Sequence, residues 1–182
     1  MKEMKIPFVF NDADYVRGVQ LGLFNVTGGI NGVQLGVVND AEYVRGVQLG
    51  VVNVTGGING VQLGVVNVAE YVRGVQLGVV NDAGGIRGVQ LGVVNDAEYV
   101  RGVQLGVVND AEYDVNGVQV GGINIANNNL EGLQIGIYCQ AGNGHYLQLG
   151  IITHRPKANK WYEKLSPLIG FSRNKNNLES KK

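Results

Sequence analysis

Apolar residues recur at every second position through most of this chain. In the segment GVQLGVVN at 32–39, Val33, Leu35 and Val37 fall on the same face of an extended backbone. An alternation with a period of two is typical of a β-strand, and the many glycine and β-branched residues disfavour a helix. The pattern therefore predicts an all-β protein in which these two valines and the leucine point into the core.

The segment GVQLGVVN repeats with a period of fourteen residues. Complete copies begin at 32, 46, 60, 74, 88 and 102, a variant (GVQLGLFN) stands at 18–25, and degenerate copies stand at 117–124, 132–138 and 147–152. One glutamine marks each of ten units: Gln20, Gln34, Gln48, Gln62, Gln76, Gln90, Gln104, Gln119, Gln134 and Gln148. A fixed period predicts an architecture in which each unit contacts its neighbours, and an even period keeps the strand alternation in phase.

Two β architectures fit this repeat. In a β-solenoid each unit forms one coil, and ten coils at the ~4.8 Å spacing of paired strands give a rod roughly 48 Å long. In an antiparallel meander or barrel each unit contributes one strand. The linkers TGGIN and AEYVR alternate at first, but AEYVR at 97–101 is followed directly by AEYDV at 111–115. Interchangeable linkers favour the solenoid, which also stacks Gln on Gln and Asn on Asn in ladders that pair their own amides.

The sequence divides into three parts. Residues 1–17 form an N-terminal lead-in or cap, 18–152 the repeat solenoid, and 153–182 a basic C-terminal cap and tail. The repeats become irregular after 117, as expected where a solenoid must protect its terminal sheet edge. The segment KANKWYEKLSPLIGF at 157–171 predicts a short helix that is broken at Pro167 and packs on the last coil. The final residues, 172–182, are expected to be disordered.

Charge is unevenly distributed, although the formal net charge is zero. Residues 11–115 contain eleven acidic residues against five arginines, whereas 153–182 contain eight lysines and arginines against two glutamates. The basic tail is therefore the only part expected to contact anionic lipid. The single cysteine, Cys139, excludes an intramolecular disulfide. As written, the N-terminus shows no signal peptide, so we expect a cytoplasmic protein, or a cell-surface protein if a leader is missing.

A nearly uniform repeat is a poor scaffold for catalysis, because an active site needs unlike groups that converge at one place. We expect no enzymatic activity, no cofactor and no metal. Cys139, His145 and His154 match no metal motif and have no orienting acid, so a structural or incidental role is expected for them. Glu42 and Arg45, with their equivalents in other units, are expected to form exposed ion pairs along a turn.

Two columns of residues are candidates for an interaction face. The second valine of VVN recurs as Phe24, Val38, Val52, Val66, Val80, Val94 and Val108. This column either packs at a corner of the core or faces outward as a flat apolar surface that favours side-by-side association. A second column contains Tyr43, Tyr71 and Tyr99, together with Tyr15 and Tyr113. These rings either pack against the glycine-rich linkers of the neighbouring coils or form a platform for a sugar or a protein partner.

The unit GVQLGVVN with AEYVR or TGGIN linkers resembles a group of bacterial short-tandem-repeat proteins with Gly-Val-Gln-(Leu/Ile)-Gly-x-x-Asn units. The surface repeat-containing proteins of Leptospira are the best known by name. The likeness covers roughly 11–152 and includes no catalytic motif. It implies a bacterial, exported protein.

We therefore expect a non-enzymatic structural or interaction protein whose flat β faces bind a second copy or another protein. The alternative is a surface adhesin or carbohydrate-binding module that uses the tyrosine column. No nucleic-acid partner is expected, because the charge of the repeat body is too sparse to imitate a duplex.

Overall fold

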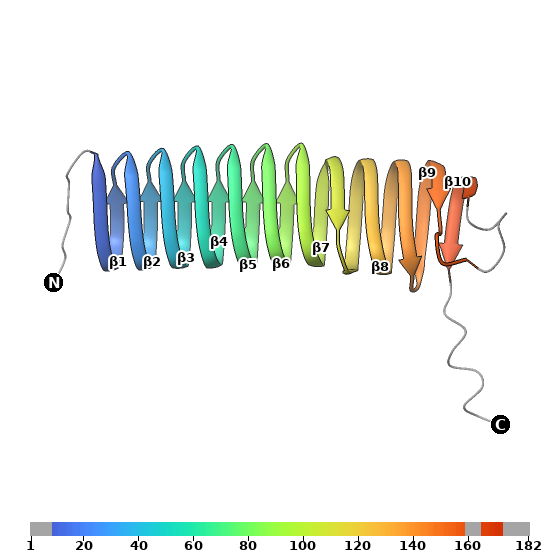
Figure 1. Ribbon diagram of the computed structural model, residues 1–182, viewed down its shortest axis with the longest axis horizontal. Helices are drawn as coiled ribbons and strands as arrows, with labels where there is room; N and C mark the ends of the chain where they lie inside the picture. Colours follow the sequence, from blue (N-terminus) through green and yellow to red (C-terminus); the bar gives the residue numbers. More distant parts are fainter. Residues whose placement is uncertain (1–8, 159–164, 173–182) are drawn as a thin grey trace, which may run out of the picture.

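The repeats fold into a rod of stacked β-coils. The structure, a computed structural model, describes residues 9–158 and 165–172. Strands β1 to β9 pair in parallel and in sequence order, so the coil at one end contains β1 and the coil at the other end contains β9 (Figure 1). The predicted all-β solenoid of about ten coils is confirmed. The antiparallel meander and the barrel are wrong.

Each coil of the regular part contributes one twelve-residue strand. β7 and β8 are longer, because there the chain passes corners without a break in the strand, whereas β9 and β10 are shorter. The strands are β1 Phe10–Leu21, β2 Phe24–Leu35, β3 Val38–Leu49, β4 Val52–Leu63, β5 Val66–Leu77, β6 Val80–Leu91, β7 Val94–Ala111, β8 Asp114–Asn143, β9 Tyr146–His154 and β10 Leu165–Ser172. β1 already pairs in register with β2 from Phe10, so the first coil starts within the lead-in proposed for 1–17. The N-terminal cap expected there falls partly on 1–8, outside the described residues.

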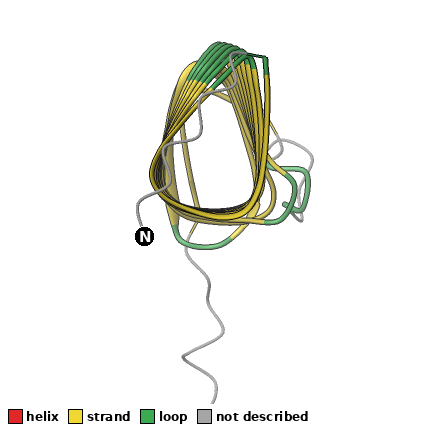
Figure 2. Cartoon of the chain, turned by 90° about the vertical axis from the view of Figure 1, so that its left-hand side faces the viewer, coloured by secondary structure: helices red, strands yellow, loops and turns green. Residues whose placement is uncertain are grey.

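Viewed along its axis, the rod has a closed, roughly triangular outline with the turns stacked at one corner (Figure 2). In the coil that begins at Gly32, the first side contains 32–35, the turn contains Gly36 and Val37, the second side contains 38–41 and the third contains 42–45. We call these the apolar face (32–35 with Val37), the acidic face (38–41) and the tyrosine face (42–45), together with the equivalent positions in every coil.

The interior contains two ladders of side-chain amides. Nε2 of Gln48 donates to Oε1 of Gln34 at 2.8 Å and to the carbonyl of Val54 at 3.2 Å. Nδ2 of Asn39 donates to Oδ1 of Asn53 at 2.8 Å and to the carbonyl of Leu49 at 2.9 Å. The same bonds recur from coil to coil, which confirms the predicted ladders. A buried amide is stable here because every coil brings it a matching donor and acceptor.

The two ladders run in opposite directions. Each Gln donates to the preceding coil and each Asn to the following one. Among the residues that the structure describes, the Oδ1 atom of Asn11 at one end has no hydrogen-bond partner, and the same holds for Oε1 of Gln148 at the other end. The asparagine ladder ends at Cys139, whose thiol accepts from Nδ2 of Asn124 at 3.8 Å.

The prediction that Val33, Leu35 and Val37 point into the core is wrong. Gln34 is fully buried, so its neighbours Val33 and Leu35 lie on the outer surface of the strand. The turn at Gly36 and Val37 then reverses the alternation, so that Val37 is exposed and Asn39 is the next inward side chain. The aliphatic part of the core comes instead from the Ala41 and Val44 positions, which are alanine or threonine and valine or isoleucine in the other regular coils.

Glycine is required at two positions of each coil. Gly46 has φ +138°, and a methyl group there would collide with the carbonyl oxygen of Gly32 in the preceding coil. At Gly50 a methyl group would lie 2.7 Å from Nδ2 of Asn39. The first glycine therefore closes a corner, and the second gives the asparagine ladder its space.

The helix expected within 157–171 is wrong for 165–171, and its part at 159–164 lies outside the described residues. Residues 165–172 form β10, which pairs antiparallel with β9 and shifts its register between Ser166 and Leu168. Pro167 lies at this shift, where a strand tolerates a residue without an N–H. β10 covers part of the last coil, as a cap should. The expectation of disorder for 172–182 falls mainly on 173–182, outside the described residues.

The ladder predicts that the position of a glutamine within the rod decides its importance. Gln76→Leu removes the donor to Oε1 of Gln62 and the acceptor for Nε2 of Gln90, so two buried amides lose a ladder bond. At about 1–3 kcal/mol for each of the two buried polar groups left unpaired, we expect the free energy of unfolding to fall by about 2–6 kcal/mol. Chemical denaturation measures this change.

The matched control is Gln20→Leu. Gln20 is the first member of the ladder and has one ladder neighbour, Gln34, so the loss should be smaller. Equal losses at the two positions would contradict the ladder account.

Candidate interaction surfaces

The apolar face extends along the whole solenoid. Its outward columns are occupied by valine, leucine, isoleucine or glycine in every coil. We call Val37 and its equivalents in the other coils the turn column. In this column Val65 and Val93 are 46% and 47% exposed, and Leu49 of the neighbouring column is 45% exposed. Over the first three coils, the turn glycines Gly22, Gly36 and Gly50 leave a shallow hollow of about 500 Å³ between Leu21 and Leu49.

Charged side chains of the regular coils lie on the other two faces. Asp40 and its equivalents belong to the acidic face, while Glu42, Arg45 and their equivalents belong to the tyrosine face. Contiguous apolar surfaces of this length are unusual on soluble monomers, so this face is a candidate interaction surface.

The column of Phe24, Val38, Val52, Val66, Val80, Val94 and Val108 points outward. Phe24 is exposed, and the valines are half-buried where the acidic face leaves the turn. The open question of corner or surface is thus answered in favour of the surface. This column widens the apolar surface around the turn, but the main part of that surface comes from the Val33, Leu35 and Val37 columns.

The tyrosine side chains pack on glycine and stay exposed. A methyl group at Gly57 would lie 3.3 Å from Cδ2 of Tyr43, and one at Gly85 would lie 3.4 Å from Cδ1 of Tyr71. Each ring therefore leans over the glycine of the next coil, as the packing interpretation predicts. Even so, Tyr71 is 70% exposed. A tyrosine ring can therefore pack on the neighbouring glycine with one side and remain accessible to a ligand on the other.

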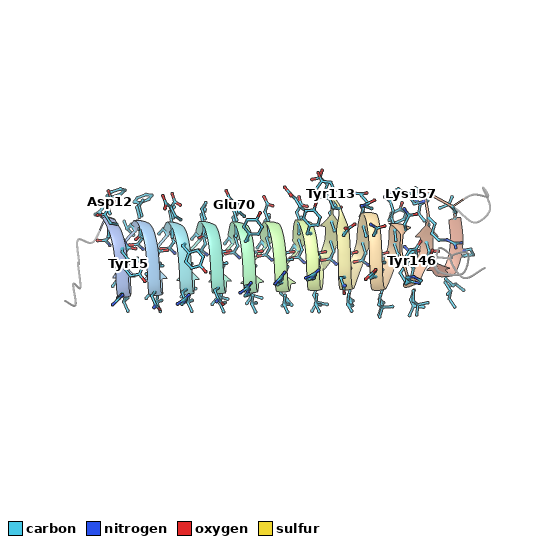
Figure 3. The ribbon with its side chains drawn as sticks, turned by 90° about the horizontal axis from the view of Figure 1, so that it is seen from below. Asp12, Tyr15, Glu70, Tyr113, Tyr146 and Lys157 are labelled. Atoms are coloured by element: carbon cyan, nitrogen blue, oxygen red, sulfur yellow. The ribbon has the colours of Figure 1, made fainter. Side chains whose placement is uncertain are left out.

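A groove of about 960 Å³ crosses the tyrosine face along the rod axis. It is lined by Tyr43, Tyr71 and Tyr99, by the glycines between them, and by Arg73, Arg87 and Arg101. Figure 3 looks onto this face, with oxygen-bearing side chains such as Glu70 along its upper edge and nitrogen-bearing side chains along its lower edge. At the far end the Tyr99 and Tyr113 rings stack at 5.0 Å between centroids.

The expected ion pairs between Glu42, Arg45 and their equivalents do not form within residues 9–158. The two side chains are three positions apart on one strand, which places them about 10 Å apart on opposite edges of the tyrosine face. Both edges therefore keep polar groups that are open to solvent.

Three aspartates form a column on the acidic face. Asp82 and Asp96 are direct neighbours on adjacent strands, and Asp110 continues the column. Burial raises the pKa of the Asp96 carboxyl, repulsion by Asp110 and Asp82 raises it further, and a hydrogen bond from the Ala97 backbone opposes the shift. Within the described residues no group of three or more His, Cys, Asp or Glu side chains has a geometry that would hold a metal ion.

Cys139, His145 and His154 occupy different environments. The Cys139 thiol is buried at the end of the asparagine ladder, and burial raises its pKa. His145 is exposed at the end of the groove, and Nδ1 of His154 lies 2.9 Å from the Tyr138 hydroxyl. The cysteine therefore has the structural position that was expected for it.

Sequence reasoning missed the main apolar columns, although a signal for them is present. Gln34 and Asn39 are five positions apart, an odd number, so a continuous alternation cannot bury both. If both amides form ladders, the chain must reverse its alternation between them, and the valines around the turn then face outward.

Comparison of the chain with protein-family models, curated proteins and solved structures finds no match. The resemblance to bacterial surface repeat proteins and the expected location therefore stay predictions. Among the described residues, no helix is long and apolar enough to cross a bilayer.

The aspartate column predicts that stability depends on pH. A raised pKa means that the folded state holds the proton more tightly than the unfolded chain, so stability falls as the pH rises through the carboxyl range. Asp96→Asn removes this penalty, and we expect a higher Tm than the parent near pH 7 and no gain near pH 3. Thermal unfolding at the two pH values measures the difference.

Asp40→Asn is the control, because Val26 and Val54 are the neighbours of Asp40 on the adjacent strands. A gain for Asp40→Asn as large as that for Asp96→Asn would contradict this interpretation.

Proposed function

We propose that this protein is a non-enzymatic structural element that associates side by side with a second copy through the apolar face. The observation that carries the proposal is the continuous exposure of valine and leucine on one face, with no charged side chain among them. Burial of such a surface is the main favourable contribution to most protein association.

The size of the face suits a dimer. At ~3.3 Å per residue and ~4.8 Å per coil, the stretch from Gly32 to Val37 and its equivalents measure roughly 16 Å by 48 Å. Two copies would bury about 1,500 Å² together, which is the usual size of a specific interface. The area is sufficient without a contribution from the other two faces.

The shape of the face also suits a second copy. The outward side chains of each coil form one rib across the face. Neighbouring ribs are separated by the strand spacing of the solenoid, and a second rod has ribs at the same spacing. Two identical faces related by a twofold axis therefore fit rib into groove along their whole length. A partner without this periodicity would match only part of the face.

The test places charge on the exposed apolar columns. In the double variant Val65→Lys/Val93→Lys, two lysines stand on the turn column two coils apart, where neither side chain contributes to the core. We expect sedimentation equilibrium to show a dimer for the parent and a dissociation constant at least about a hundredfold higher for the variant.

Val54→Lys is the matched control, because Val54 is 37% exposed but belongs to the acidic face. It should dimerise like the parent. A parent that is monomeric at about 100 µM would contradict the proposal, and so would a double variant that dimerises as the parent does. A monomeric parent that binds neutral lipid vesicles, with binding lost in the double variant, would assign the face to a membrane instead.

A further inference from the structure

We propose that the groove on the tyrosine face binds a linear, extended polysaccharide of low charge, aligned with the rod axis. This site is independent of the apolar face, because the two surfaces lie on different sides of the triangular coil. The proposal rests on the spacing of the rings, on the polar groups at the two edges and on the shape of the groove.

The rings form a regular series of platforms. Tyr43, Tyr71 and Tyr99 stand on alternate coils, so neighbouring rings are about 9.6 Å apart, twice the strand spacing. Gly57 and Gly85 occupy the coils between them and leave the floor open. Extended glycans in which successive sugars face opposite ways repeat every second unit, so such a chain offers equivalent sugar faces to successive rings.

The edges of the groove supply the hydrogen bonds that sugar hydroxyls need. Arg73, Arg87 and Arg101 occupy one edge on three consecutive strands, in direct register with one another. Glu70 and Glu98 stand on the opposite edge of the tyrosine face, about 10 Å away, outside the lining of the groove itself. The carboxylates that line the groove are those of Asp114 and Glu131. A hydroxyl both donates and accepts a hydrogen bond, so a chain of sugars between the two edges can donate to the carboxylates and accept from the guanidinium groups.

The arginine column is itself unfavourable without a ligand or counterion. Like charges directly opposite on neighbouring strands repel one another, and these three guanidinium groups have no acidic partner among the described residues. The column therefore marks an edge where external acceptor atoms would be stabilised.

A single-stranded nucleic acid fits this groove less well than a glycan. Nucleic-acid binding needs a groove that is positive throughout, because each nucleotide carries a full negative charge. Here one edge is carboxylate, and the neighbouring acidic face adds the Asp82–Asp96–Asp110 column. The alternation of charge across the groove favours a ligand with many hydroxyls and few charges.

The experiment measures binding of hexasaccharides by isothermal titration calorimetry. The probes are cellohexaose and chitohexaose, which are extended, and maltohexaose, which is helical; a ten-nucleotide oligothymidylate represents single-stranded nucleic acid. We expect at least one extended probe to bind, and maltohexaose and the oligonucleotide to bind at least tenfold more weakly. The apolar-face variant Val65→Lys/Val93→Lys should bind the glycan like the parent.

Three variants locate the site. Tyr71→Ala and Tyr99→Ala should each weaken glycan binding about tenfold, because each removes one platform. Gly85→Tyr should weaken it similarly by filling the open floor, while the fold accepts tyrosine on consecutive coils, as Tyr99 and Tyr113 show. Tyr15→Ala is the control, because the Tyr15 ring also leans on a glycine but does not line the groove.

Circular dichroism and the Tm establish that each variant is folded. Absence of binding to both extended glycans at millimolar concentration would overturn the proposal. Unchanged binding in both Tyr71→Ala and Tyr99→Ala would overturn it as well, and so would preferential binding of the oligonucleotide. A parent that binds glycan but stays monomeric would overturn only the dimer proposal.

Discussion

The buried amide ladders are the interaction on which the rest of this structure depends. A glutamine or asparagine in a protein interior is stable only if its donors and its acceptor are paired. Here the pairing partner is the same residue in the next coil, 2.8 Å away for both Gln34 and Gln48 and Asn39 and Asn53. This condition fixes the register of every coil, because a shift by one residue would leave whole columns of amides unpaired.

The composition of the outer surface follows from the same condition. Since Gln34 and Asn39 take the inward positions, the valines and the leucine between them must face outward, and Gly36 must lack a side chain to admit the asparagine amide. The interior is therefore more polar than usual and one outer face is more apolar than usual. The proposed dimerisation makes use of that inverted distribution, whereas the tyrosine face, where the sequence varies between AEYVR and TGGIN, is free to bind a different ligand.

The sequence was sufficient to predict the solenoid, the coil length and the ladders, because all three follow from an even repeat with identical residues in register. The hydrophobic alternation by itself gave the wrong direction for Val33, Leu35 and Val37, because it does not reveal that the turn at Gly36 reverses it. The signal for the reversal is the odd spacing between Gln34 and Asn39. The strand at 165–172 was also missed, since its apolar residues cluster around Pro167 without a clear period of two. The groove depends on which coils contain tyrosine, which the sequence shows, and on where each ring lies, which only the structure shows.

The most direct test of the inward amides is hydrogen exchange at the side-chain NH₂ groups of the glutamines. In a ¹⁵N-resolved NMR experiment, the structure predicts that the NH₂ groups of Gln48, Gln62, Gln76 and Gln90 exchange as slowly as the buried backbone amides of their own coils, because each is fully buried and donates to the glutamine of the preceding coil. Exchange at the rate of a solvent-exposed glutamine side chain would contradict this account, since it would place the amides outside and the valines within.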